Sequence, residues 1–159
     1  MTLDVVLVEP EIPPNTGNVA RTCAAVGARL HLVEPLGFQW LDPRVKRAGV
    51  DYWHLVEVGR HSTWEAMPRD LLRPERLYLF TGRGGRRFDE VPYADDAVLV
   101  FGRESTGLPE HLLDRHSDRW CTIPMRPGLR SLNLSNAAAL AMYEVMRQRG
   151  YAGMAPGRG

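Results

Sequence analysis

Amide, hydroxyl and guanidinium side chains gather just after the first apolar stretch of the chain. Residues 12–27 read IPPNTGNVARTCAAVG, where turn-forming residues stand beside Asn15 and Asn18, and Arg21 follows. A strand-to-helix connection needs only two to six residues of no particular chemistry. Two amides, a hydroxyl and a guanidinium are more than a plain connection needs, which raises the question of whether they bind a ligand. The structural alternative is that Asn15 or Thr16 caps a helix and that Arg21 is a solvated helix residue.

A second group of polar atoms follows the apolar run AVLVF at 97–101. The next residues, GRESTG at 102–107, offer a glycine, main-chain groups and the Glu104 carboxylate. Gly102 would let a flat ligand approach the main chain closely, and Glu104 can accept from a hydroxyl or amine or pair with an arginine. The structural alternative is a tight turn that leaves Glu104 near a helix N-terminus, where a carboxylate is favoured anyway.

The third group lies at 123–136, IPMRPGLRSLNLSN, just before and inside the start of a helix. One serine or asparagine there is explained as a helix cap, but capping does not need so many. Ile123 and Met125 add apolar surface suited to a nucleobase or a thioether. The polar members are Arg126, Arg130, Ser131, Asn133, Ser135 and Asn136.

The common nucleotide-binding and hydrolase fingerprints do not fit these loops. GRGGRR at 82–87 begins like the dinucleotide motif, but Arg87 occupies its last glycine position and no clear helix follows. GRESTG has the glycine spacing of a P-loop, yet Leu108 and Pro109 replace the lysine and hydroxyl residue. Glu104 stands where a nucleophile elbow has its serine.

Composition bounds the class of protein. The chain has 159 residues, 44% hydrophobic, with a net charge of +1, which indicates one soluble domain with its own core and excludes the bulk positive field of a strongly basic nucleic-acid binder. Lys46 is the only lysine, so arginine supplies 19 of the 20 basic side chains. Arginine suits bidentate phosphate contacts, although a codon bias produces the same composition.

Cysteine and histidine usage points away from disulfides and metal. Cys23 and Cys121 lie far apart in apolar contexts, so we expect two reduced, buried thiols. His111 and His116 are off the i, i+4 spacing of a helical metal pair, and we expect no metal site. No leader-like N-terminus or membrane-length apolar run occurs, so we expect a cytoplasmic protein without membrane contact.

Strand-like and helix-like segments alternate along the chain. Strands are expected at 3–8, 30–33, 52–58, 76–80, 97–101 and 120–123. Helices are expected at 16–26, 42–48, 63–72, 109–114 and 134–149, with Gly27 in the left-handed conformation that ends the first. This alternation predicts an α/β fold, with a mainly parallel sheet and helices on both faces.

Ligands of such sheets bind beyond the carboxyl ends of the strands. The unusual loops PPNTGN, TGRGG, GRESTG and MRPGLRSLNLSN all fall at that edge, which predicts a site there. We expect one domain over 1–152 and a flexible tail over 153–159.

Three motifs in order carry a family resemblance: EPEIPPNTGNVARTCA, VFGRESTGLP and IPMRPGLRSLNLSNAAALAMYE. They resemble the SPOUT class of RNA methyltransferases, and within it the small YibK/TrmL group, the tRNA (cytidine/uridine-2'-O)-methyltransferases of the wobble position. The resemblance covers nearly the whole chain. It implies a deep C-terminal trefoil knot, which periodicity does not predict because true knots are so rare.

The resemblance also implies S-adenosylmethionine as cofactor, held in the knot mostly by main-chain groups, and a homodimer whose sites borrow residues from the partner. The residues that it places at the cofactor are Phe80, Thr81, Gly82, Gly102, Glu104, Ile123, Met125, Ser131 and Leu132. Those that it places at the RNA are Asn18, Arg21, Arg130 and Tyr143, with Tyr143 near the dimer interface.

The implied reaction is methylation of the ribose 2'-hydroxyl of the wobble nucleotide in the tRNA anticodon loop. A sulfonium is an activated methyl donor, so the protein must position and deprotonate a poor nucleophile. A guanidinium is always protonated. We therefore expect Arg21 to hold the neighbouring phosphate and stabilise the developing oxyanion, with the proton leaving to that phosphate or to water. Asn15, Asn133 and Ser135 are the other expected catalytic residues.

Further arginines and Lys46 are candidates for phosphate contacts along the anticodon stem-loop: Arg44, Lys46, Arg47, Arg83 and Arg86. The sequence leaves other functions open. They are 2'-O-methylation at another tRNA or rRNA position, a non-catalytic RNA-binding protein of the same fold, and a nicotinamide oxidoreductase, which the failed glycine fingerprint disfavours.

Overall fold

A seven-stranded sheet organises the computed structural model, which describes residues 1–158 except for the side chains at positions 50 and 51. The strand order is β3-β2-β1-β6-β4-β7-β5, and every pair of neighbouring strands runs parallel. The strands are β1 (Asp4–Val8), β2 (Arg29–Val33), β3 (Val58–His61), β4 (Leu77–Phe80), β5 (Arg86–Arg87), β6 (Val98–Phe101) and β7 (Trp120–Thr122). The predicted parallel α/β sheet is therefore confirmed.

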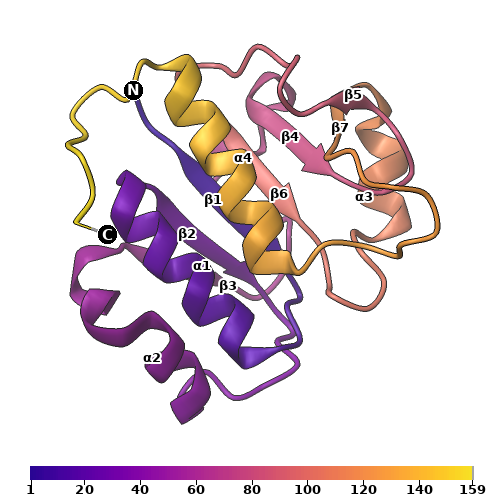
Figure 1. Cartoon of the computed structure of the whole chain (residues 1–159). Helices are drawn as coiled ribbons and strands as arrows, with labels where there is room; N and C mark the ends of the chain where they lie inside the picture. The colour runs from indigo at the N-terminus through magenta and orange to yellow at the C-terminus, as the bar shows by residue number, and fades with distance from the viewer. Residues whose placement is uncertain (159) are drawn as a thin grey trace.

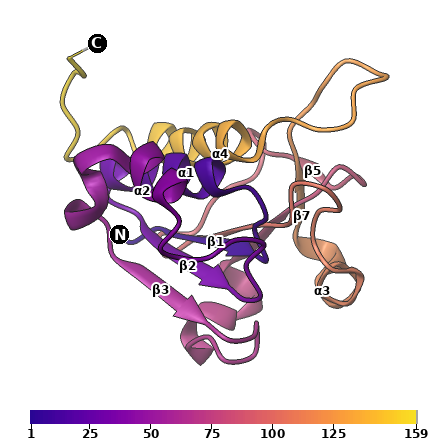
Figure 2. The same ribbon diagram turned by 90° about the horizontal axis from the view of Figure 1, so that it is seen from below.

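Helices cover both faces of the sheet. On one face lie α1 (Pro13–Val26), α2 (Pro43–Gly49) and α4 (Leu134–Gln148), which Figures 1 and 2 show as one layer. The short α3 (Glu110–Arg115) packs on the opposite face. Four 3-10 turns complete the chain: η1 (Val50–Leu55), η2 (Arg69–Leu72), η3 (Pro74–Arg76) and η4 (Ser117–Arg119). No helix in the described part of the chain is both long and apolar enough to cross a membrane.

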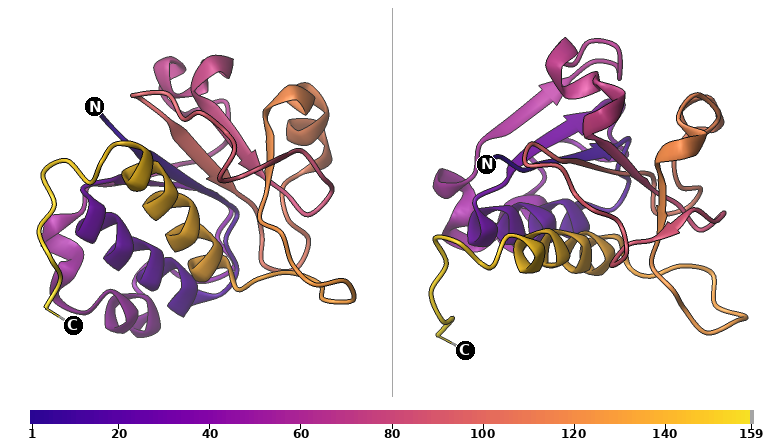
Figure 3. Two further views of the ribbon diagram at one scale, coloured as in Figure 1. Left: turned by 45° about the horizontal axis from the view of Figure 1, so that its top comes forward. Right: turned by 90° about the horizontal axis from the view of Figure 1, so that it is seen from above.

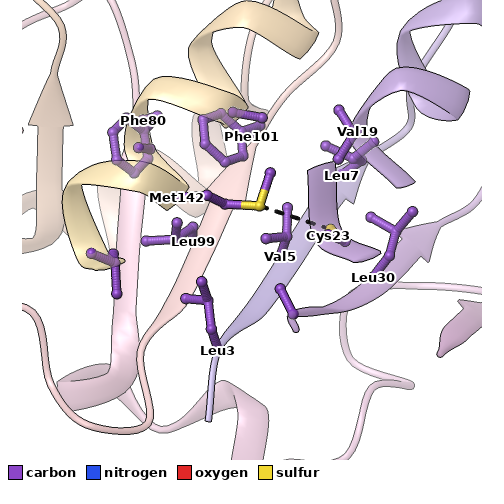
Figure 4. Close-up of a cluster of buried hydrophobic side chains, with 14 of the residues drawn as sticks. Leu3, Val5, Leu7, Val19, Cys23, Leu30, Phe80, Leu99, Phe101 and Met142 are labelled. Carbon is purple, nitrogen blue, oxygen red and sulfur yellow. Dashed lines mark hydrogen bonds between the residues drawn. The ribbon is translucent and has the colours of Figure 1, made fainter. Parts of the chain in front are cut away.

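Alternating strand residues supply two cores, one on each face of the sheet. Val5 and Leu7 of β1 pack toward α1 and α4, where Cys23 and Met142 bring their sulfur atoms within 3.9 Å (Figure 4). Cys23 is a free, buried thiol, as the sequence predicts, and burial raises its pKa to about 12. Val6 belongs to the second core, on the face covered by α3 and residues 63–72.

Several predicted boundaries are wrong for identifiable reasons. The first helix begins at Pro13 rather than Thr16, so the expected loop PPNTGN is its first turn. Two successive prolines have no N–H to leave unsatisfied and suit a helix start. Neither Asn15 nor Thr16 is the cap, because the N-cap residue is Ile12, which makes no side-chain cap hydrogen bond. Gly27 does end the helix, with φ 76°.

Three other elements differ from the prediction. Residues 52–55 belong to η1, so the strand expected at 52–58 is wrong and β3 begins at Val58. Residues 63–68 form turns before η2, because the buried positions Trp64, Met67 and Leu71 reach the second core without a continuous helix. The two-residue β5 carries no periodicity that a sequence could reveal.

A buried charge cluster closes the amino-terminal edge of the sheet, opposite the ends from which β1 and β6 lead into the loops. Asp4 accepts from Arg29 at 2.7 and 2.8 Å, from His31 Nε2 at 2.9 Å and from Arg76 at 3.2 Å. Burial by itself would raise the pKa of Asp4, but the hydrogen bonds and charges of His31 and Arg29 outweigh it and lower the pKa. His31 Nδ1 lies 3.1 Å from His61 Nε2. Asp4 thus joins β1 and β2 at the edge away from the loops, and His31 extends the cluster to His61 at the end of β3.

Candidate functional site

A groove of about 670 Å³ lies at the carboxyl ends of β4, β6 and β7. The loop that leads from β7 to α4, residues 123–133, borders it and projects from the body of the molecule in Figure 3. Parallel strands end at one edge, so their following loops converge there. Segments far apart in sequence, from Ile12 to Ala137, therefore share one cavity.

The floor of the groove is aromatic. Phe80 ends β4 and Phe101 ends β6, and their rings stack with centroids 4.7 Å apart and planes 17° apart. Both rings are almost fully buried, yet both line the cavity. Met125 and Leu132, from the loop before α4, provide apolar atoms at the rim. The groove thus combines apolar side-chain atoms with loop main chain.

Glu104 fastens the amino end of α1 to the groove. One carboxylate oxygen accepts from the Glu11 N–H at 2.8 Å, and the other accepts from the Ile12 N–H at 3.1 Å and from Asn15 Nδ2 at 3.4 Å. The sequence prediction made Glu104 a cofactor ligand. Its position on the groove agrees with that prediction, but both of its oxygens are already engaged with the chain.

Asn15 connects the first and third motifs. Its Oδ1 accepts from Asn133 Nδ2 at 3.0 Å. Asn133 Oδ1 in turn accepts from the Ser135 N–H at 2.9 Å and the Asn136 N–H at 3.3 Å, so Asn133 is the N-cap of α4. Ser135 also donates its hydroxyl to Asn133 at 2.6 Å. One of the several polar residues there is therefore a cap, as the sequence indicated, and it is also a groove residue.

Gly102 has a structural reason to be glycine that the sequence did not reveal. A Cβ at this position would overlap the main chain of Gly107 and Leu108. These residues return past Gly102 because Arg103 and Gly107 exchange hydrogen bonds of 2.9 and 3.1 Å. The absent side chain makes room for the protein's own turn, and the residues of that turn line the groove.

Arg21 lies outside the groove of its own chain. Six residues separate it from Asn15, about 9 Å along the helix axis, and it is not among the lining residues. Its guanidinium carbon sits 5.2 Å from the centre of the Tyr52 ring, a cation–π contact. Asn18, Ser135 and Tyr143 also lie outside the lining.

All nine residues expected at the cofactor line the groove: Phe80, Thr81, Gly82, Gly102, Glu104, Ile123, Met125, Ser131 and Leu132. Asn15, Asn133 and Arg130 join them. The structure therefore brings together residues from three motifs. Of the side chains expected to face RNA, Arg130 lines the groove, whereas Asn18 and Arg21 of α1 and Tyr143 of α4 lie outside it.

Sequence reasoning missed a second layer of contacts beside the groove. Glu11 accepts from the Ser105 N–H at 3.0 Å and hydroxyl at 2.6 Å, and these bonds lower the pKa of Glu11. Arg103 donates to Glu9 at 2.8 Å. Acidic residues at 9 and 11 are separated from their partners by more than 90 positions, and no local pattern signals such pairs.

The fold and groove define an α/β protein whose ligand site lies between a glycine-containing turn and the loop before its last helix. The chain matches the SpoU rRNA Methylase family over residues 2–143 and belongs to that family. The motif resemblance is thereby confirmed.

Individual members of the family are similar to this protein over nearly the whole chain. The chain is 47% identical over 152 residues to the tRNA (cytidine(34)-2'-O)-methyltransferase of Burkholderia ambifaria, covering 94% of this chain and 97% of that protein. It is also 47% identical to the protein of the same name in Escherichia coli K12, covering 95% and 96%.

Solved structures are similar to the whole chain. One, described as "Structural insights into the 2-OH methylation of C/U34 on tRNA", has a TM-score of 0.88 at 45% identity and covers 94% of this chain and 97% of that one. The SpoU methyltransferase AviRb of Streptomyces viridochromogenes, in complex with AdoMet, has a TM-score of 0.81 at 26% identity and covers 93% and 58%.

Proposed function

We propose that this protein transfers a methyl group from S-adenosylmethionine to the ribose 2'-hydroxyl of nucleotide 34, the wobble position, in the anticodon loop of tRNA. The observation that carries the proposal is the convergence of three motifs on one groove, joined by the Glu104–Asn15–Asn133 hydrogen bonds. Relatives of the same length and nearly half-identical sequence bear the name of that activity.

The chemistry of the groove fits the cofactor. Phe80 and Phe101 would provide apolar atoms against which an adenine packs, and loop main chain at Thr81, Gly82 and Ile123 would provide donors and acceptors for its edge. The methylene groups of the cofactor's methionine moiety suit the apolar rim at Met125 and Leu132. When bound, S-adenosylmethionine supplies an electrophilic methyl group on a sulfonium.

The chain's own residues would orient the acceptor. Asn15 and Asn133 present amide groups at the groove, and their mutual hydrogen bond fixes both side chains before RNA arrives. Pre-set polar groups stabilise developing charge without reorganisation. Arg21 would hold the phosphate beside the target ribose through its two-pronged donors, and the hydroxyl proton would leave to that phosphate or to water.

Arg21 reaches a groove most simply across a homodimer. Within one chain it points onto Tyr52 instead, so the groove that it serves would belong to the partner. The outer surface of α4 supports such packing, because Leu140 is 46% exposed and Tyr143 42% exposed. Large apolar side chains exposed together indicate a surface that is covered by a partner. We place Asn18 and Tyr143 at this interface, near the RNA.

Three further features belong to the same proposal. The segment that carries β7 and the loop 123–133 would be threaded as the trefoil knot of the SPOUT class. The protein would work in the cytoplasm, with no metal and no membrane contact. Residues 1–152 would form the single domain. The tail assignment, 153–159, stays a prediction; Met154 packs against the core, and position 159 lies outside the described residues.

Mass mapping of ribose methylation tests the function directly. Purified protein is supplied with S-adenosylmethionine and either cellular tRNA from a strain lacking this gene or tRNA transcripts with cytidine or uridine at position 34. A methyl group on the ribose of nucleotide 34 supports the proposal. Methylation at another position would support a different RNA target, and RNA binding without methyl transfer would support a non-catalytic RNA-binding protein. Either result would overturn the proposal.

A further inference from the structure

We propose that α2 and η1, together with Arg21, hold the phosphate backbone of the RNA next to the target nucleotide. We call this set the α2 surface: Arg21, Lys46, Arg47 and Tyr52. The inference rests on the proposed function, and it assigns the partner's sugar-phosphate chain to one particular surface of the protein.

Charge distinguishes α1 and α2 from the elements on the opposite face of the sheet, although η1 itself includes Asp51. Every charged side chain in α1 and α2 is cationic. Lys46 and Arg47 are exposed on consecutive positions of the last turn of α2. The elements of the opposite face have mixed charge, since η2, α3 and η4 each contain an acidic residue. The net charge of +1 therefore conceals an uneven distribution.

The other candidates for phosphate contacts are engaged within the chain. Arg83 pairs with Glu110, and Arg86 donates to the Glu90 carbonyl at 3.2 Å. Arg44 donates to Asp42 at 2.9 and 3.2 Å. An RNA phosphate would have to displace a carboxylate at Arg83 or Arg44. Lys46 and Arg47, for which the described side chains provide no such pair, are therefore the better phosphate-binding cations among the five expected from the sequence.

Gly17 brings α2 close enough to join Arg21 in one surface. A Cβ at position 17 would overlap the Val45 carbonyl oxygen and lie 2.5 Å from the Ala48 Cβ. Glycine therefore lets α2 pack flush against α1, with Val45 buried between them. Arg21 is one helical turn beyond Gly17, so it lies on the part of α1 that faces α2. Figure 2 shows the two helices side by side.

Two contacts of Trp53 hold η1 in place, one with α2 and one with Trp40 of the preceding loop. Trp53 Nε1 donates to the Lys46 carbonyl at 3.1 Å, and the Trp53 ring meets Trp40 edge-on with centroids 5.6 Å apart. Tyr52 then lies under Arg21. A guanidinium that rests on an aromatic face keeps its in-plane N–H donors available. Tyr52 thus positions Arg21 while leaving its donors for a phosphate.

Salt dependence measures these contacts. Binding of a tRNA transcript with cytidine at position 34 is titrated at several salt concentrations for the wild type and for the double variant Lys46→Ala, Arg47→Ala. The matched control removes two exposed arginines from the opposite face, Arg69→Ala with Arg115→Ala. Each lost phosphate contact lowers the slope of log K against log salt by roughly 0.7 to 0.9.

We expect the α2 double variant to bind about tenfold more weakly at low salt, with a slope smaller by roughly 1 to 2, while the control matches the wild type. S-adenosylmethionine affinity, measured by calorimetry, should be unchanged in both. If the wild type methylates nucleotide 34 but the α2 variant keeps the wild-type slope, this surface is wrong and the function stands. If the wild type neither binds nor methylates tRNA, the proposed function fails first.

Tyr52 gives a second readout that does not depend on net charge. Tyr52→Phe keeps the aromatic face and Tyr52→Leu removes it. We expect the phenylalanine variant to retain tRNA affinity and the leucine variant to lose several-fold, in proportion to a cation–π contact of about 1 kcal/mol. Equal affinity in the two variants would show that the ring does not position Arg21.

Discussion

Asn133 donates its Nδ2 to Asn15 Oδ1 at 3.0 Å, across 118 positions of sequence. The same Asn133 side chain caps α4 through its Oδ1. The Nδ2 of Asn133 therefore contacts Asn15 while its Oδ1 caps the helix, so a substitution can remove one of these functions and keep the other. The bond joins the first turn of α1 to the start of α4 at the edge of the groove, so the two helices place the polar groups of the site jointly.

Replacing Asn133 by aspartate or alanine separates capping from the contact with Asn15. The Asn133→Asp variant keeps an oxygen for the cap but loses the N–H donor, whereas Asn133→Ala loses both and about 1 kcal/mol of helix capping. We expect a lower melting temperature only for the alanine variant, and a strong loss of methyl-transfer rate in both. Full activity in Asn133→Asp would show that the bond to Asn15 is dispensable.

Arg21 and Asn133 should complement each other in mixed dimers. If Arg21 serves the partner's groove, a heterodimer of Arg21→Ala and Asn133→Ala contains one intact site. Random mixing then gives about a quarter of wild-type activity from two inactive proteins, by the symmetry of a twofold dimer. The measurement is tRNA methylation after co-refolding or co-expression. No recovery, with heterodimers verified by mass spectrometry, would place Arg21 in its own chain's site.

Arg21→Lys tests the fork geometry of the same side chain. Lysine keeps the charge but cannot make two parallel hydrogen bonds to a phosphate. We expect turnover to fall while tRNA affinity falls less. Near-full turnover in Arg21→Lys would show that bidentate geometry is not needed, and normal methylation by Arg21→Ala would remove Arg21 from catalysis.

Two glycines of the groove should differ in their tolerance of a methyl group. Gly102→Ala places a Cβ into the main chain of Gly107 and Leu108, so the turn must open, with an expected cost of about 3 kcal/mol, at the upper end of overpacking effects. Gly82→Ala meets no atom within 4 Å and should keep wild-type stability. Urea unfolding of the two variants checks this. Equal stability would mean that the turn after β6 adapts easily.

Acidification should destabilise the fold in two stages. Burial, followed by the charge of His31, lowers the pKa of His61, and burial followed by Arg115 lowers that of His116. A folded state that binds fewer protons than the unfolded chain loses stability as pH falls below the ordinary histidine pKa of 6.5. Asp4, whose pKa is lowered from 3.8, contributes stability that is lost only below about pH 4.

Melting temperatures at about pH 7.5 and 5.5 test the histidine stage. His61→Gln should reduce the difference between the two temperatures, and the exposed His111→Gln should leave it as in the wild type. An unchanged difference in His61→Gln would assign the effect to His116 or to other groups.

Local patterns in the sequence predicted the parallel α/β sheet and most of its strands, although β3 was expected too early and the two-residue β5 was missed. Apolar runs such as 97–101 identify buried strands wherever they occur, and Gly27 marks the end of a helix by its own conformational freedom. The three motifs identified the family, and the resemblance placed nine residues at the cofactor, all of which line the groove. These properties depend on residues that are close together in sequence.

Only the tertiary structure decided which side chains meet. The contacts of Glu104 with residues 11–15, the bond between Asn15 and Asn133, and the placement of Arg21 on Tyr52 all join segments brought together by the sheet and helix packing. The reason for Gly102 was equally invisible, because it depends on how the chain returns five residues later. Sequence periodicity reports the surroundings of one element at a time, whereas a site depends on how several elements are placed relative to each other.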